Sequence, residues 1–238
     1  MPSLCEQIKT EYEQLQALTE QLVLEYEKVK DSDDLNDLKD WSVVKKLQTE
    51  WEAVYANLEA KLYVSVERAR ELLGRENVFG PEEVKKTWGV RLEQVPDILF
   101  SEAELKECKD THILVMVCPL SIVEIRDKFP GDQHLIYAQE WYNNESFAKD
   151  RGKVGWHLVR KMPAENSTYK KWDEQQALLG KNEEMPTAQV MIYTIIGHFL
   201  ATGERLFDDV YVRCSDVVSN GDLVRVGVFN ANGLHVSY

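Results

Sequence analysis

The chain has 238 residues, of which 44% are hydrophobic and 29% are charged, and its formal net charge at pH 7 is −13. This composition is typical of globular proteins and excludes a wholly disordered chain. The negative charge argues against nucleic-acid binding, because contacts to phosphates need clustered Lys and Arg side chains that the sequence lacks.

The amino terminus, "MPSLCEQIKTEYEQ", is charged from its sixth residue and has no apolar signal core. No segment approaches the ~20 apolar residues of a membrane span. We therefore expect a cytoplasmic protein without a membrane span. The cysteines are widely spaced without a Cys-x-x-Cys pair, which predicts reduced, mostly buried thiols at Cys5, Cys108, Cys118 and Cys214.

Residues 1–75 are predicted to form a helical hairpin. Apolar residues recur in steps of three and four over residues 3–30, and the pattern resumes from Trp41 until Gly74, a typical helix C-cap. The cap-type stretch "DSDDLND" separates the two stripes. Two interpretations stay open: residues 3–73 form a homo-oligomeric stalk, or the hairpin packs locally on the rest of the chain.

Residues 76–110 are predicted to be a connector with short helices. In "FGPEEVKKTWGV", Pro81 suits a helix start and Gly89 a helix end. In "SEAELKE", Ser101 and Glu104 have the spacing of a capping box, which predicts a second short helix.

The third predicted domain covers residues 111–238 and begins with strands. The continuous apolar run "HILVMVC" predicts a buried strand, "LSIVEIRDKF" a short helix, and "HLIYA" and "GWHLVRK" further strands.

Two helices are predicted next, over 168–179 with Ser167 or Thr168 as the cap, and over 187–202. The second is apolar around most of its circumference, which indicates a central helix. The stretches "VYVRCSD", "DLVRVGVFN" and "GLHVSY" then predict three antiparallel strands joined by the turns "SNG" and "NANG". This order predicts an α+β fold.

No motif for nucleotide binding, zinc proteolysis or a nucleophile elbow is present. The stretch "DRGKVG" at 150–155 is too short for a phosphate loop and predicts a turn before a strand. The histidines are dispersed without metal-ligand spacing, so we expect no metal, no cofactor and no catalytic residues. These histidines are His112, His134, His157, His198 and His235.

Three stretches carry a family resemblance: 79–105, 155–178 and 187–236, the last including "LVRVGVFNANGLHV". They resemble an uncharacterised group of proteins from candidate-phylum bacteria and related microbes. The carboxy-terminal part of that group looks like the C-type-lectin-fold variable proteins of diversity-generating retroelements. The resemblance implies a C-type-lectin-like scaffold in which one strand, two helices and late antiparallel strands bind a ligand through exchangeable residues.

The resemblance implies that polar residues among the late strands contact a protein or other macromolecular ligand. They are Arg213, Ser215, Asn220, Arg225, Asn230, Asn232, His235 and Ser237, together with Tyr238. Apolar neighbours such as Val226 and Val236 would be framework, because burial fixes their register. The chain departs from the family in "YVRCSD", which replaces an aromatic and threonine-rich strand, and in having no counterpart of a further loop and final strand.

The leading hypothesis is therefore a non-enzymatic ligand-binding protein. The first alternative is a structural or assembly protein that oligomerises through the helical hairpin. The second alternative is an enzyme on a formylglycine-generating-type scaffold, but of its expected cysteine pair only Cys214 lies in the late segment.

Overall fold

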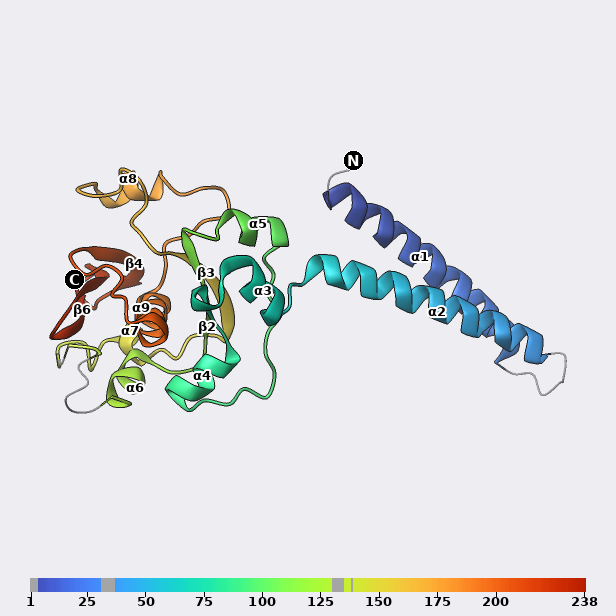
Figure 1. The fold of residues 1–238 in the computed structure, drawn as a ribbon, viewed down its shortest axis with the longest axis horizontal. Helices are drawn as coiled ribbons and strands as arrows, with labels where there is room; N and C mark the ends of the chain where they lie inside the picture. The colour runs from blue at the N-terminus through green and yellow to red at the C-terminus, as the bar shows by residue number, and fades with distance from the viewer. Residues whose placement is uncertain (1–3, 31–36, 130–134, 138) are drawn as a thin grey trace. The chain divides into compact units, whose positions relative to one another are not determined.

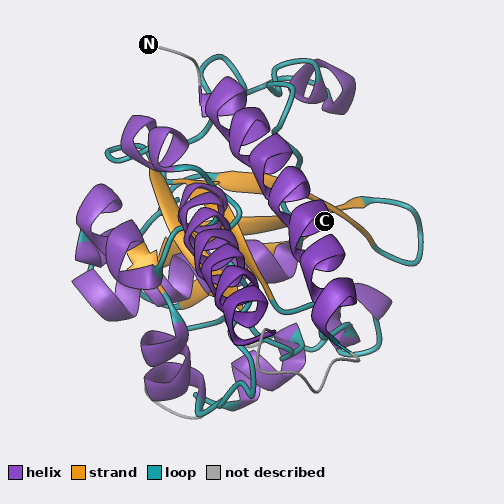
Figure 2. Ribbon diagram, turned by 90° about the vertical axis from the view of Figure 1, so that its right-hand side faces the viewer, coloured by secondary structure: helices purple, strands orange, loops and turns teal. Residues whose placement is uncertain are grey.

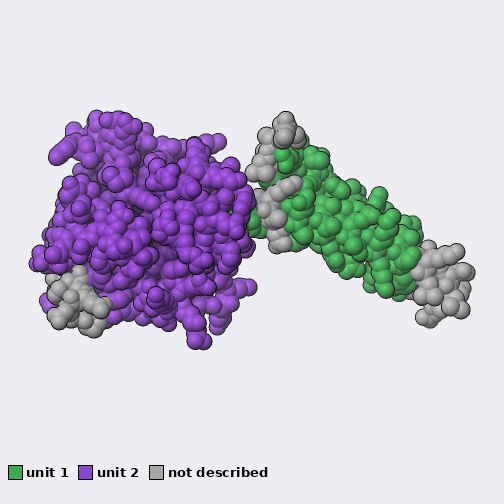
Figure 3. Space-filling model, in the orientation of Figure 1, with its two compact units in different colours: residues 1–64 green, residues 65–238 purple. Residues whose placement is uncertain are grey.

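The computed structural model of the chain consists of two compact units, Met1–Val64 and Ser65–Tyr238 (Figure 3). The boundary falls before the predicted one at residue 75, and the predicted connector 76–110 lies within the second unit. The residues that the structure describes are 4–30, 37–129, 135–137 and 139–238.

The first unit is the predicted helical hairpin, made of α1 (Leu4–Val29) and α2 (Asp37–Leu62) (Figure 1). The helices are antiparallel, because the indole of Trp51 donates a hydrogen bond to Thr19 and the amide of Asn57 donates one to Glu11. The predicted turn "DSDDLND" lies outside the described residues except for its last residue.

The second predicted helix was too long, because the structure interrupts it after Leu62. A separate helix, α3 (Val66–Leu73), begins at the cap residue Ser65, whose hydroxyl accepts a hydrogen bond from the Arg68 amide. The guanidinium of Arg70 is buried and lies 3.0 Å from a carboxylate oxygen of Glu83 in the second unit. Ion pairs of this kind hold α3 to the rest of the second unit, to which it belongs.

The second unit contains short helices and two sheets, with long loops between them (Figures 1 and 2). Its helices after α3 are the 3₁₀ helix η1 (Arg75–Asn77), α4 (Pro81–Trp88), α5 (Glu102–Glu107), α6 (Ile122–Asp127), α7 (Ser146–Lys149), α8 (Trp172–Gln176) and α9 (Ala188–Thr202). Its strands are β1 (Val78–Phe79), β2 (His112–Val117), β3 (Gly155–Arg160), β4 (Tyr211–Val217), β5 (Leu223–Asn230) and β6 (Gly233–Ser237).

The short helices of the predicted connector are confirmed. Helix α4 has Pro81 in its first turn and Gly89 as its left-handed C-cap, and Ser101 and Glu104 form the predicted capping box of α5. The prediction over 168–179 was too long, because α8 has five residues and its N-cap is Lys171.

The predicted strand "HLIYA" is reduced to a single parallel bridge between Ile136 and Leu234. Its first and last residues, His134 and Ala138, lie outside the described residues. The strands β2, β3, β4, β5 and β6 all lie where the sequence predicts them.

Helix α9 lies between two three-stranded sheets, ordered β1-β2-β3 and β4-β5-β6 (Figure 1). All residues from Ala188 to His198 are buried, as expected for a helix that is apolar around its circumference. Strand β1 runs parallel to β2, whereas the strand pairs β2–β3, β4–β5 and β5–β6 are antiparallel. The fold is α+β, with α9 as the shared core element.

Among the described residues, no helix is both long and apolar enough to cross a bilayer.

Candidate functional site

The sheet β4-β5-β6 divides its side chains into two sets. One row across the three strands consists of Val212, Val226 and Val236, which pack into the core. Because successive side chains in a strand point to opposite faces, the neighbouring rows point away from α9. We call these outward residues the outer face: Tyr211, Arg213, Arg225, His235 and Ser237.

Four of the residues predicted for ligand contact therefore share one face. Arg213 pairs with Arg225, and Arg225 pairs with Ser237, so three of them form one continuous row. His235 lies opposite Gly227 in the adjacent row. The alternation of valine and polar residues in the sequence is what predicts that these polar residues share a face.

The predicted asparagines lie in turns or, in the case of Asn230, at the end of β5 beside a turn, and they stabilise these turns. The side chain of Asn220 accepts a hydrogen bond from the Asp222 amide at 2.9 Å, and that of Asn230 accepts one from the Asn232 amide at 2.8 Å. Such side-chain contacts to the main chain are typical of turns. Ser215 lies at the strand edge, where its amide donates a hydrogen bond to the Pro186 carbonyl.

Arg213 holds a neighbouring loop in place. Its Nη1 donates hydrogen bonds to the Lys170 carbonyl at 2.7 Å and to Oε1 of Gln175 at 2.9 Å. Lys170 and Gln175 belong to the segment that contains α8. The half-buried Arg213 thus contributes structure as well as positive charge.

Arg225 lies between two aromatic residues. Its guanidinium carbon is 5.9 Å from the ring centroid of Tyr211, and Nη2 donates a hydrogen bond to the main-chain oxygen of Tyr238. Stacking of a guanidinium over a ring is attractive and leaves other N–H groups free to donate.

Aromatic side chains that the sequence did not assign to the site border the outer face. The ring of Tyr137 stacks on His235 with centroids 4.4 Å apart, and Trp141 contacts Tyr238 with centroids 4.8 Å apart. Tyr137 is next to β6 because its amide donates a hydrogen bond to the Leu234 carbonyl. Their only sequence signal is the aromatic content of residues 137–142, which does not show that they lie beside β6.

The outer face carries a positive charge, although the net charge of the whole chain is negative. Arg213 and Arg225 lie directly opposite each other, an arrangement that costs stability between like charges. In the part of the chain that the structure describes, neither arginine forms a salt bridge, and their hydrogen-bond acceptors are main-chain and amide oxygens. Burial lowers the pKa of His235, which favours the neutral form of its imidazole.

A glycine permits the close approach that shapes this sheet. At Gly227, which has φ +155°, a Cβ atom would lie 2.1 Å from the Val210 carbonyl oxygen. The next residue, Val228, has φ +51°, which is rare for a β-branched residue, and its amide donates a hydrogen bond to Val210. The irregularity of β5 lies between Gly227 and Asn230, beyond the regular pairing that aligns the two outward rows.

Cys214 and His235 do not form a thiol–imidazole pair. Cys214 is fully buried among core residues, where burial raises the pKa of its thiol, whereas His235 is on the outer face. The described residues contain no group of three His, Cys, Asp or Glu side chains that could hold a metal ion.

Comparison of the chain with protein-family models, with curated proteins and with solved structures finds no match.

Proposed function

We propose that the chain is a non-enzymatic binding protein whose outer face contacts an acidic surface of a protein partner. The observation that carries this proposal is the opposed pair Arg213 and Arg225, neither of which pairs with an Asp or Glu side chain among the described residues. Arginine and exposed aromatic side chains dominate the energetics of protein interfaces. Tyr211 and Tyr238 are 41% and 49% exposed and supply the aromatic contacts.

The arrangement of the second unit also supports a C-type-lectin-like display scaffold. Strand β3, helices α8 and α9, and the antiparallel strands β4 to β6 follow in the order that the family resemblance implies. The framework row of valines is fixed by burial, so exchange of outward residues leaves the register of the strands unchanged. Diversification by a retroelement is part of this proposal.

A selection from a random peptide library tests the binding function on the full chain. We expect the enriched peptides to combine Asp or Glu with aromatic residues and to bind less tightly as salt increases. Arg225→Glu abolishes this binding, whereas the matched control Arg91→Glu, at an exposed position outside the outer face, retains it. Equal loss in both variants, or enrichment of basic peptides, would contradict the proposal.

Comparison of close relatives within one genome tests the display function. The proposal expects differences concentrated at Arg213, Arg225, His235 and Ser237, near a reverse-transcriptase gene and a near-duplicate of the final segment. Identical residues at these positions in all copies would contradict the display function.

A second candidate function is assembly through the hairpin. The exposed apolar residues Val23 and Leu24 on α1 favour it, with 55% and 62% of their surfaces exposed. We expect Leu24→Glu to convert an oligomer of the full chain to a monomer in light-scattering measurements. A wild-type chain that is already monomeric at high concentration would rule this function out.

A further inference from the structure

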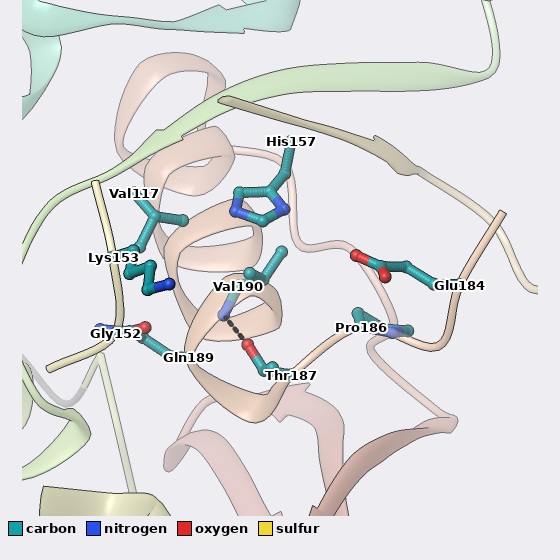
Figure 4. A pocket seen from close by; sticks show the side chains of 9 residues that line it. All are labelled: Val117, Gly152, Lys153, His157, Glu184, Pro186, Thr187, Gln189 and Val190. Atoms are coloured by element: carbon teal, nitrogen blue, oxygen red, sulfur yellow. Dashed lines mark hydrogen bonds between the residues drawn. The ribbon is translucent and has the colours of Figure 1, made fainter. Parts of the chain in front are cut away.

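A cavity of about 170 Å³ lies between β3 and the amino-terminal turn of α9 (Figure 4). Its floor is apolar and includes Val117 of β2 and Val190 of α9. His157 of β3 faces Val190 across the cavity (Figure 4). This site is separate from the outer face, and its function is independent of the one proposed above.

A buried amide braces one wall of this cavity. The side chain of Gln189 is 8% exposed and donates hydrogen bonds to the carbonyl oxygens of Leu120 and Arg151 at 2.6 and 2.7 Å. Gly152, with φ +62°, lies against it, because a Cβ atom there would be 2.2 Å from Oε1 of Gln189. The stretch "DRGKVG" is therefore held as one wall of a preformed cavity.

Two opposite charges border the cavity without pairing. Lys153 and Glu184 lie on opposite sides of Val190 (Figure 4). Neither of these two side chains forms an ion pair or a hydrogen bond with any described residue. The imidazole of His157 lies between the two charged side chains (Figure 4). Burial lowers its pKa, and the charge of Glu184 partly opposes this shift.

We propose that this cavity binds a small zwitterion of the apolar α-amino acid type. Lys153 and His157 hold its carboxylate, Glu184 holds its ammonium group, and its side chain rests on Val117 and Val190. The volume suits such a molecule, because a cavity of roughly 150 Å³ accommodates benzene.

The charges of the cavity distinguish a zwitterion from simpler ligands. A small anion would be attracted by Lys153 but repelled by Glu184 and by the net charge of −13. A small cation would be attracted by Glu184 but repelled by Lys153. A zwitterion is the ligand that pairs both charged groups while covering the apolar floor.

Titration of the full chain with L-alanine and L-valine, followed by ¹H–¹³C NMR of the histidine rings, tests this proposal. The spectrum of His157→Gln assigns the resonance of His157. We expect a saturable shift of that resonance with an affinity in the millimolar range, as is usual for ligands with so few atoms. Two matched probes, 3-methylbutanoate and isobutylamine, each carry one of the two charges and should bind at least about fivefold more weakly.

Two substitutions test the charged side chains of the cavity, and two matched substitutions at exposed positions outside it serve as controls. Lys153→Met and Glu184→Gln should each weaken L-valine binding at least about fivefold, whereas Lys181→Met and Glu165→Gln should leave it unchanged. The proposal is overturned if neither amino acid shifts His157 saturably, if 3-methylbutanoate binds as tightly as L-valine, or if Lys153→Met binds like the wild type. Circular dichroism confirms that each variant is folded.

Discussion

The two sheets that pack on α9 differ in how many of their faces are covered. In β2, every residue from Ile113 to Val117 is buried, so both faces of the strand are covered. In β5, fully buried residues such as Val224 and Val226 alternate with half-buried ones such as Leu223 and Arg225. In the first sheet, both faces of the central strand are buried. In the second sheet, residues on the outer face can be substituted without changing the packing of the core.

The largest expected effect is at the glycine that shapes the second sheet. Gly227→Val would bring a Cβ atom against the Val210 carbonyl and force a branched residue into a positive φ. We expect a loss of about 3 kcal/mol or more in the free energy of unfolding. Urea denaturation measures it, and a loss below that of a typical surface substitution would show that β5 can rearrange freely.

A pair of substitutions on the faces turned away from α9 sharpens the comparison. Leu114 of β2 is fully buried, and Leu114→Ala should cost about 2–4 kcal/mol because it leaves a cavity. Ser237 of β6 is on the outer face, and Ser237→Ala should change the unfolding free energy by less than about 0.5 kcal/mol. Similar costs for the two would remove the difference between the sheets.

The pH dependence of stability compares one histidine from each sheet. Burial lowers the pKa values of both His157 and His235 in the folded chain. The unfolded chain therefore takes up protons first, and stability should fall as the pH drops below about 6.5, the usual histidine pKa.

His157 lies deeper than His235, so His157→Gln should remove more of this pH-dependent loss than His235→Gln. Denaturation midpoints between neutral and mildly acidic pH provide the measurement. A larger effect of His235→Gln would contradict the deeper burial of His157.

A similarly small effect on stability is expected at Arg225. Arg225→Gln removes the ring contact with Tyr211 and the hydrogen bond to Tyr238, but it also removes a like charge opposite Arg213. These terms oppose each other, so we expect a change within about 0.5 kcal/mol. A thermal melt tests this, and a marked destabilisation would make Arg225 a structural residue.

The alternating patterns of the sequence predicted the elements that depend on local periodicity. The valines and polar residues of β5 gave the correct strand and both of its faces, and the apolar circumference of α9 gave its central position. The cap at Ser101 likewise located α5. In each case, the residues that define the element are close together in the sequence.

Elements that depend on distant contacts were predicted less well. The apolar stripe continues from α2 into α3, but α3 belongs to the second unit, where Arg68 pairs with Glu102 and Arg70 pairs with Glu83. The Ser65 cap was the local signal for that break. Tyr137 and Trp141 reach the site only because residues 135–137 pair with β6, and periodicity gives no information on such contacts.

The most direct test compares two triple alanine variants within the same sheet. One replaces the inward row Val212, Val226 and Val236, and the other replaces the outward row Arg213, Arg225 and Ser237. The account predicts that the inward variant loses several kcal/mol of unfolding free energy in urea, whereas the outward variant loses at most about 2 kcal/mol and no longer binds acidic peptides. An outward variant as unstable as the inward one, or one that still binds those peptides, would contradict the assignment of the outer face as a contact surface.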